Sequence, residues 1–200
     1  VKPTVPPTTT GGALQVNPFT DIKTGDWFYA AVQYVRENGL MNGTSSTLFS
    51  PHANTTRGMV VTILYRMAGS PAVTAANPFD DVAAGQYYTN AVIWASENKI
   101  VTGYGNGKFG PNNAITREQM AVILMNYAKL KGYDVSARAG LSGFGDVASV
   151  SGWAQDALSW ANAKGFIQGS SNKLTPGGNA ERCQVAAILQ RFIEMYGTKL

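Results

Sequence analysis

The sequence has few of the residues that metal centres and disulfide frameworks require. Its 200 residues include one cysteine, Cys183, and one histidine, His52. A lone cysteine excludes an internal disulfide and a cysteine-rich zinc site, and a lone histidine excludes most histidine-based metal and acid–base schemes. We therefore expect no cofactor and no metal. Cys183 is expected to pack as a small buried residue, and His52 to be a solvated loop residue.

Charge is also scarce. Charged residues make up 14% of the chain, about half of the roughly 25% found in typical globular domains, which excludes a highly charged disordered chain. The 16 basic and 12 acidic side chains leave a net charge of +4, without the clustered cations of a nucleic-acid-binding surface. No apolar run approaches the roughly 18 residues that span a bilayer, so we expect no insertion into a membrane.

Residues 1–17 are rich in proline, threonine and glycine and have no periodic apolar pattern. This composition predicts an extended linker that connects to a further domain upstream in the same polypeptide. The weakly charged composition with a single cysteine also favours a protein exported from a bacterium.

What the chain does contain is a threefold internal repeat. A Phe-x-Asp motif recurs at separations of 60 and 65 residues, and the same features follow each copy in the same order. We therefore divide the chain into the linker 1–17 and three repeats, 18–70, 71–135 with a connector, and 136–200. The recurring residues are Asp21, Asp81 and Asp146; Trp27, Tyr87 and Trp153; Gly43, Gly103 and Gly169; and Arg57, Arg117 and Arg182.

Each repeat has the pattern of a helix, a glycine-rich loop and a second helix. In the third repeat, for example, the spacing places Trp153, Ala157 and Trp160 on one apolar helix face. Two such helices bury too little apolar surface to fold alone, so the three repeats must share one core. We predict a mainly all-α fold with approximate threefold symmetry about a common axis and three equivalent grooves between neighbouring repeats.

An arginine is expected to open the second helix of every repeat. In the middle repeat Thr116 is a suitable N-cap, and Gln119 completes a capping box that places Arg117 at the first helical position. The first repeat has Thr56 at the matching position, but Gly58-Met59 follow its arginine, so it lacks the capping partner and its helix start is expected to be weaker. A cation is mildly disfavoured there, because a helix N-terminus carries partial positive charge. An arginine at this position in all three repeats therefore predicts a partner.

Two partners remain open. The first is structural: an aspartate of a neighbouring repeat (Asp21, Asp81 or Asp146) would pair with the arginine. The second is an external carboxylate or phosphate, held by the guanidinium together with free backbone amides at the helix start.

Taken together, the three units resemble the S-layer homology (SLH) triplet, over residues from about 18 to 197. In the middle repeat, Gly103-Tyr-Gly-Asn-Gly-Lys-Phe109-Gly-Pro111 followed by Ile115-Thr116-Arg117-Glu118 nearly spells the loop and the I-T-R-A-E motif of that family. The resemblance implies a pseudo-threefold body around a central three-helix bundle. It also implies a non-catalytic, secreted module that anchors a protein to the cell wall, or S-layer surface, of a Gram-positive-type bacterium.

The ligand that the resemblance implies is an anionic cell-wall polysaccharide, a secondary cell-wall polymer ending in pyruvylated N-acetylmannosamine. The three arginines would contact its carboxylate, and the three loop glycines would let the backbone approach the sugar. The aromatics Trp27, Tyr87 and Trp153 would form an apolar wall for the sugar ring, although core packing is the simpler expectation for them.

The departures from the family pattern predict unequal grooves. The groove with Arg117 is expected to be the best site and that with Arg182 the weakest, because Glu181 can compete with a ligand anion for Arg182. The alternative function is a self-assembly or protein-docking module that binds no sugar. A cell-wall hydrolase is disfavoured, because few acidic residues recur between the repeats.

Overall fold

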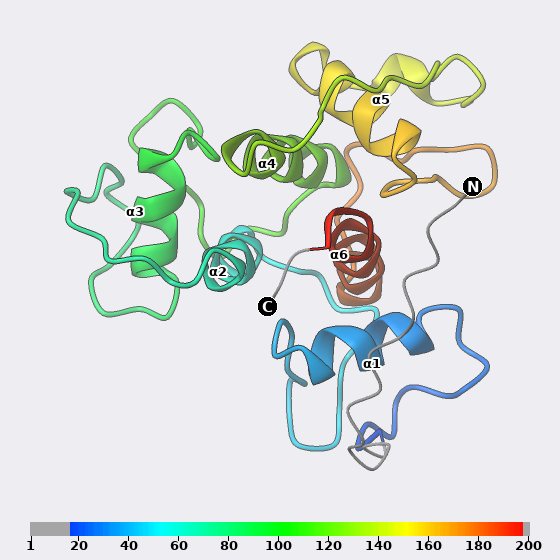
Figure 1. Ribbon diagram of the computed structural model, residues 1–200, viewed down its shortest axis with the longest axis horizontal. Coiled ribbons are helices and arrows are strands. Elements are labelled where there is room, and N and C mark those ends of the chain that lie inside the picture. The colour runs from blue at the N-terminus through cyan, green and yellow to red at the C-terminus, as the bar shows by residue number, and fades with distance from the viewer. Residues whose placement is uncertain (1–16, 198–200) are drawn as a thin grey trace.

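The computed structural model describes residues 17–197, which form six α-helices and two short 3-10 helices without any strand (Figure 1). Residues 1–16 of the expected linker lie outside the described part. None of the described helices is long and apolar enough to cross a membrane. The elements are α1 (Tyr29–Glu37), α2 (Arg57–Met67), α3 (Thr89–Glu97), α4 (Arg117–Leu130), η1 (Val147–Ser149), η2 (Gly152–Ala154), α5 (Gln155–Ala163) and α6 (Arg182–Tyr196).

The three repeats are interleaved around a common axis. The second helices α2, α4 and α6 surround the axis and are seen nearly end-on in Figure 1, with the first helices α1, α3 and α5 outside them. Each outer helix packs on the central helix of the preceding repeat: α3 on α2, α5 on α4, and α1 on α6. The last helix therefore packs on the first, and the all-α, pseudo-threefold prediction is confirmed.

A closed ring of backbone hydrogen bonds joins the segments that precede the central helices. The amide of Thr55 donates to the carbonyl of Ala180 (3.0 Å), Ala180 donates to Ile115 (2.8 Å), and Ile115 donates to Thr55 (2.9 Å). Each repeat supplies one donor and one acceptor, so removing any repeat breaks two of the three bonds.

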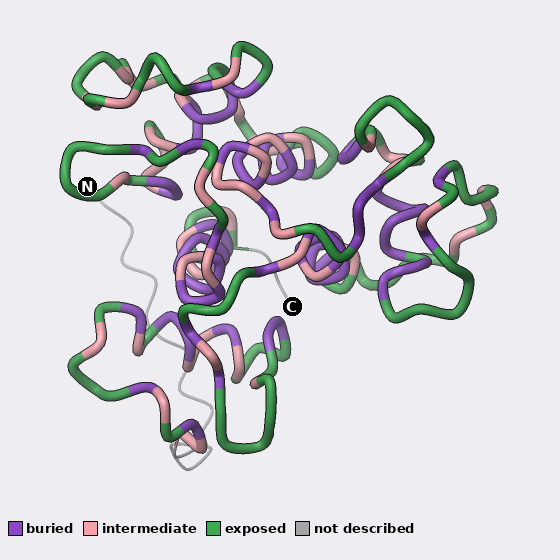
Figure 2. The backbone as a smooth tube through the Cα atoms, turned by 180° about the vertical axis from the view of Figure 1, so that it is seen from behind, coloured by how far each residue is buried: buried purple, intermediate pink, exposed green. Residues whose placement is uncertain are grey.

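The core is built from the apolar faces of all six helices, and exposed residues gather on the outer loops (Figure 2). Core packing of the three repeated aromatics was the wrong expectation: Trp27, Tyr87 and Trp153 are 63%, 57% and 59% exposed. The outer α-helices begin two residues after these aromatics. The residue that follows each aromatic fills the core position instead, and these residues are Phe28, Tyr88 and Ala154.

Candidate functional site

Each aspartate of the Phe-x-Asp motif holds the loop of its own repeat. The two carboxylate oxygens of Asp81 accept hydrogen bonds from the amides of Phe109 and Gly110, both at 2.8 Å. Gly110 has a positive φ of 70°, which the two bonds help to fix. The other repeats make the same pair of bonds: the amides of Phe49 and Ser50 donate to Asp21, and those of Leu174 and Thr175 donate to Asp146.

The arginine of the preceding repeat holds the same loop from the opposite side. Nε of Arg57 donates to the carbonyl of Phe109 at 2.9 Å, so Arg57 and Asp81 bind one residue between them. The equivalent bonds run from Arg117 to Leu174 and from Arg182 to Phe49, so the last repeat closes back on the first. Each arginine and aspartate therefore act through a shared backbone unit, and none of the ion pairs within residues 17–197 joins them directly.

The first two backbone amides of each central helix are bonded to a neighbouring loop, contrary to expectation. The amide of Arg117 donates to the carbonyl of Gly178 (2.9 Å), and that of Glu118 donates to Pro176 (3.0 Å). The third amide is capped by Thr116, in the capping box that the sequence predicts. Thr56 also caps the third amide of α2, without a capping box, and α6 has no side-chain cap. Because neighbouring loops and caps occupy these amides, an anion would be bound by the arginine side chain.

The pKa values of Asp81, Asp146 and the arginines that share their loops are shifted by burial and by these hydrogen bonds. Burial lowers the pKa of Arg117, and the negative charge of Asp146 opposes this effect. The amide of Leu174 is the largest of the contributions that hold the pKa of Asp146 below its ordinary value. Burial raises the pKa of Asp81, but the backbone hydrogen bonds outweigh it, so the net shift is downward. Arginine stays protonated near neutral pH.

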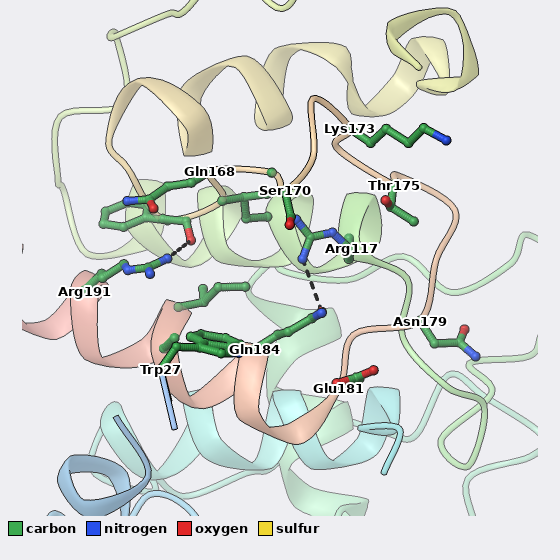
Figure 3. Close-up of a pocket in the computed structure, with 15 residues that line it drawn as sticks. Trp27, Arg117, Gln168, Ser170, Lys173, Thr175, Asn179, Glu181, Gln184 and Arg191 are labelled. Carbon is green, nitrogen blue, oxygen red and sulfur yellow. Dashed lines mark hydrogen bonds between the residues drawn. The ribbon is translucent and has the colours of Figure 1, made fainter. Parts of the chain in front are cut away.

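A cavity of about 560 Å³ lies beside Arg117 (Figure 3). It is bounded by Arg117 of the second repeat, by the loop 166–170 and helix α6 of the third, and by Trp27 of the first. Nη1 of Arg117 donates to Oε1 of Gln184 at 3.2 Å. Arg191 enters from a different side, with Nη1 donating to the carbonyl of Phe166 at 3.2 Å. With Lys173 also on its wall, this cavity carries three cations.

A second cavity, of about 530 Å³, lies beside Arg57 and repeats this plan. It combines Arg57 of the first repeat with the loop 100–104 and helix α4 of the second, and with Trp153 of the third. The guanidinium carbon of Arg57 lies 4.7 Å from the ring centre of Tyr104, a cation–π contact that the first cavity lacks, since Ser170 occupies the equivalent position. Both aromatic residues that line this cavity are exposed, and it has a single lining cation.

The arginine of the third repeat is more fully engaged by its surroundings. Arg182 is 6% exposed, its Nε donates to Phe49, and its Nη2 donates to the carbonyl of Asn42 at 2.6 Å. At the position of Gln119 and Gln184 the first repeat has Met59. Tyr87, the third exposed aromatic, lines neither of the two cavities described above.

The loop glycines are explained first by packing. A Cβ atom on Gly43, Gly103 or Gly169 would lie 2.5, 2.6 or 2.7 Å from a ring carbon of the Phe-x-Asp phenylalanine of the same repeat. Gly103 and Gly169 also line the two cavities, whereas Gly43 does not.

None of the ion pairs of the described residues joins the Glu181 carboxylate to Arg182, the pairing expected from the sequence. Oε2 of Glu181 lies 2.8 Å from Nδ1 of His52, and Glu181 also lines the cavity beside Arg117. His52 is an exposed loop residue, as expected, with 69% of its side chain accessible, and its ring nitrogen also pairs with Glu181. Cys183 is buried as expected, and burial, aided by the charge of Glu181, raises its pKa to about 12.

Several cavity residues were not predicted from the sequence. Gln184 and Arg191 line the cavity beside Arg117, and Tyr104, Gln119 and Asn126 line the cavity beside Arg57. The two glutamines had a visible signal, since both lie two residues after a repeated arginine. The others differ between repeats, so the repeat pattern did not select them.

This fold and site define a closed helical module of three repeats with composite grooves between them. The S-layer homology domain family matches residues 18–58, 78–121 and 143–186, and the chain belongs to this family.

Proteins named for different functions are similar to this chain over most of its length. The chain is 31% identical to the surface-layer 125 kDa protein of Lysinibacillus sphaericus over 186 residues, which are 91% of this chain and 15% of that protein. It is 32% identical to an endoglucanase of Bacillus sp. over 177 residues, 88% of this chain and 19% of the relative. A cellulosome-anchoring protein of Acetivibrio thermocellus is 24% identical over 165 residues, 77% of this chain and 35% of the relative. The chain thus spans about a third or less of these relatives.

Proposed function

We propose that this chain is a non-catalytic module that anchors an exported polypeptide to the bacterial cell wall by binding an anionic cell-wall polysaccharide in its inter-repeat grooves. Relatives named as an endoglucanase and as a surface-layer protein share this segment but little else of their length with the chain. A segment common to proteins with such different names is better explained by a shared location than by a shared reaction. The name of the cellulosome-anchoring protein supports the same inference.

The observation that carries the proposal is the cavity beside Arg117. Its lining has three cations against the one carboxylate of Glu181, an excess that favours an anionic group, and the exposed Trp27 ring offers an apolar surface against which a sugar can stack. The ligand that fits this combination is a carboxylate-bearing sugar, and we infer the pyruvylated N-acetylmannosamine terminus of a secondary cell-wall polymer, of the kind found in Gram-positive-type bacteria.

The grooves are expected to differ in affinity. The Arg57 cavity has one lining cation and two exposed aromatics, Tyr104 and Trp153, so it suits stacking more than charge recognition. Arg182 is 6% exposed and lines neither of the two described cavities, whereas Arg117 is half-buried and lines the first. We therefore rank the Arg117 groove first and the Arg182 groove last.

Calorimetric titration with a synthetic pyruvylated N-acetylmannosamine and its unpyruvylated twin tests the proposal. The pyruvylated sugar should bind and its twin should bind at least about tenfold more weakly, because the carboxylate contact is lost. Trp27→Ala should weaken binding more than Tyr87→Ala. Both side chains are largely exposed, so neither change should unfold the chain. Equal affinity for the two sugars would refute the carboxylate contact, and oligomers without sugar affinity would support the self-assembly alternative.

A further inference from the structure

A second cluster of polar side chains lies where the third repeat closes on the first. Oε2 of Glu181 lies 2.8 Å from Nδ1 of His52 and 3.5 Å from Sγ of Cys183. Each of the three residues offers one donor atom, and these atoms lie within 4.8 Å of one another. Imidazole nitrogen, carboxylate oxygen and thiolate sulfur are together ligands of zinc, whereas calcium and magnesium take oxygen ligands.

The backbone already holds these side chains in position. The amide of Cys183 donates to the carbonyl of Pro51, and the amide of Arg182 donates to that of Ala53, both at 2.9 Å. These two bonds bracket His52 on both sides, and Asn54 and Glu181 form an antiparallel bridge beside them. The edge-to-face contact between Phe28 and His52, with ring centres 5.7 Å apart, further restricts the imidazole. Binding an ion here would require little further ordering of the backbone.

The donor set belongs to one of the three pseudo-equivalent junctions. Where the first repeat meets the second, the corresponding residues are Asn112, Thr56 and Gly58, and where the second meets the third they are Gly177, Thr116 and Glu118. The repeat architecture therefore does not require His52, Glu181 and Cys183. At the Glu181 position the other repeats have a threonine that caps its helix, whereas Glu181 makes no such bond.

We propose that His52, Glu181 and Cys183 bind a zinc ion that clasps the third repeat to the first. Zinc–ligand distances of roughly 2.0–2.3 Å in a tetrahedron place the donors about 3.3–3.8 Å apart. The two Glu181 separations quoted above need to change by less than about 1 Å to reach this spacing. Binding forms the zinc–sulfur, zinc–nitrogen and zinc–oxygen bonds, releases the thiol proton to solvent and leaves water as the fourth ligand.

The zinc ion would join the one pair of neighbouring repeats that no segment of the chain connects. His52 and Glu181 are 129 residues apart in the sequence, and the chain does not connect the third repeat back to the first. A bond between them closes a long loop and so stabilises the folded ring. The sequence contains one cysteine and one histidine, and from this count no metal site was expected. The count could not show that the two residues lie together at this junction.

Zinc titration of the untagged chain, in a buffer with a non-thiol reductant and without polysaccharide, tests the proposal. We expect one zinc ion per chain, and with cobalt(II) a thiolate-to-metal charge-transfer band. Saturating zinc should raise the thermal unfolding midpoint by roughly 5–10 °C at a free concentration a hundred times the dissociation constant. Calcium chloride at the same concentration should have no such effect.

The repeats themselves supply matched variants that should fold. His52→Asn and Glu181→Thr introduce the residues that the second repeat has at the equivalent positions, Asn112 and Thr116. Cys183→Ala removes the sulfur and should abolish the charge-transfer band. Each variant should weaken zinc binding by about tenfold or more and lose the zinc-dependent midpoint shift. Stoichiometric zinc binding with equal affinity in all three variants, or no binding by the unaltered chain, would overturn the proposal.

Discussion

Replacing Asp81 by alanine removes the acceptor of two backbone amides at once. The carboxylate binds the amides of Phe109 and Gly110, and the carbonyl of Phe109 in turn orients Arg57 of the preceding repeat. The change should therefore release the loop of the second repeat and loosen the arginine at the edge of its cavity.

The magnitude follows from the two bonds. A hydrogen bond to a charged group contributes about 1.5–3 kcal/mol, so two such bonds contribute roughly 3–6 kcal/mol. Asp81 is half-buried, and water can replace part of each bond when the carboxylate is lost. We therefore expect Asp81→Ala to lower the free energy of unfolding by about 2–4 kcal/mol, and Asp81→Asn, which keeps one acceptor oxygen, by about half of that.

The neighbouring residue is a matched control. The Asp80 side chain is 74% exposed and its Oδ2 lies 3.7 Å from Nζ of Lys108. An exposed ion pair contributes less than about 1 kcal/mol, so Asp80→Ala should change stability little. Urea unfolding followed by tryptophan fluorescence measures both variants, with unchanged slopes expected. If Asp81→Ala and Asp80→Ala differ by less than about 1 kcal/mol, the aspartate does not hold the loop as argued.

Three further predictions concern stability. Gly103→Ala should cost about 2–4 kcal/mol in urea unfolding, because the new Cβ meets an aromatic ring and a backbone carbonyl, both 2.6 Å away, at a φ of 69°. Gly105→Ala, at a φ of 81° but in open space, should cost only about 1 kcal/mol. Tyr127→Phe should leave stability at pH 7 unchanged or higher, because its buried hydroxyl has no hydrogen-bond partner. It should also reduce the loss of stability between about pH 10 and 12, since the pKa of Tyr127 is raised to about 12 in the folded chain. In acid, the lowered pKa values of Asp81 and Asp146 predict stability that is present above about pH 4 and is lost as the pH falls through their folded-state values, measured as a falling urea midpoint.

The local features of the fold could be predicted from the sequence. The position of Arg117 at the first turn of α4 and the capping box of Thr116 with Gln119 were both read from a few adjacent residues, and both are confirmed. Helix caps depend on neighbours within one turn, so a short stretch of sequence contains the information.

The spacing predicted the register of the outer helices, since Ala157 and Trp160 are buried, but it did not predict where each helix begins. Trp153 fits the apolar spacing of its helix, but the chain enters that helix through the 3-10 turn η2, and Ala154 takes the core position. Partners across repeats were equally hidden, because the contacts that join Arg182 to Phe49 span 133 residues. Spacing within one repeat does not show which neighbour receives the arginine.

An arginine at the start of the second helix of every repeat suggests a ligand. The bonds that these arginines donate to the loop carbonyls, however, already account for their presence in all three repeats. The case for a ligand therefore rests on the residues that the framework does not need. Those residues differ between the two described grooves: Tyr104 and Asn126 line one, where Ser170 and Arg191 line the other. Each groove also takes its arginine, its loop and its aromatic from three different repeats, so no single repeat contains a groove. On the proposed function, closure of the ring is thus a condition for binding as well as for stability, and the variable wall residues would set what each groove binds.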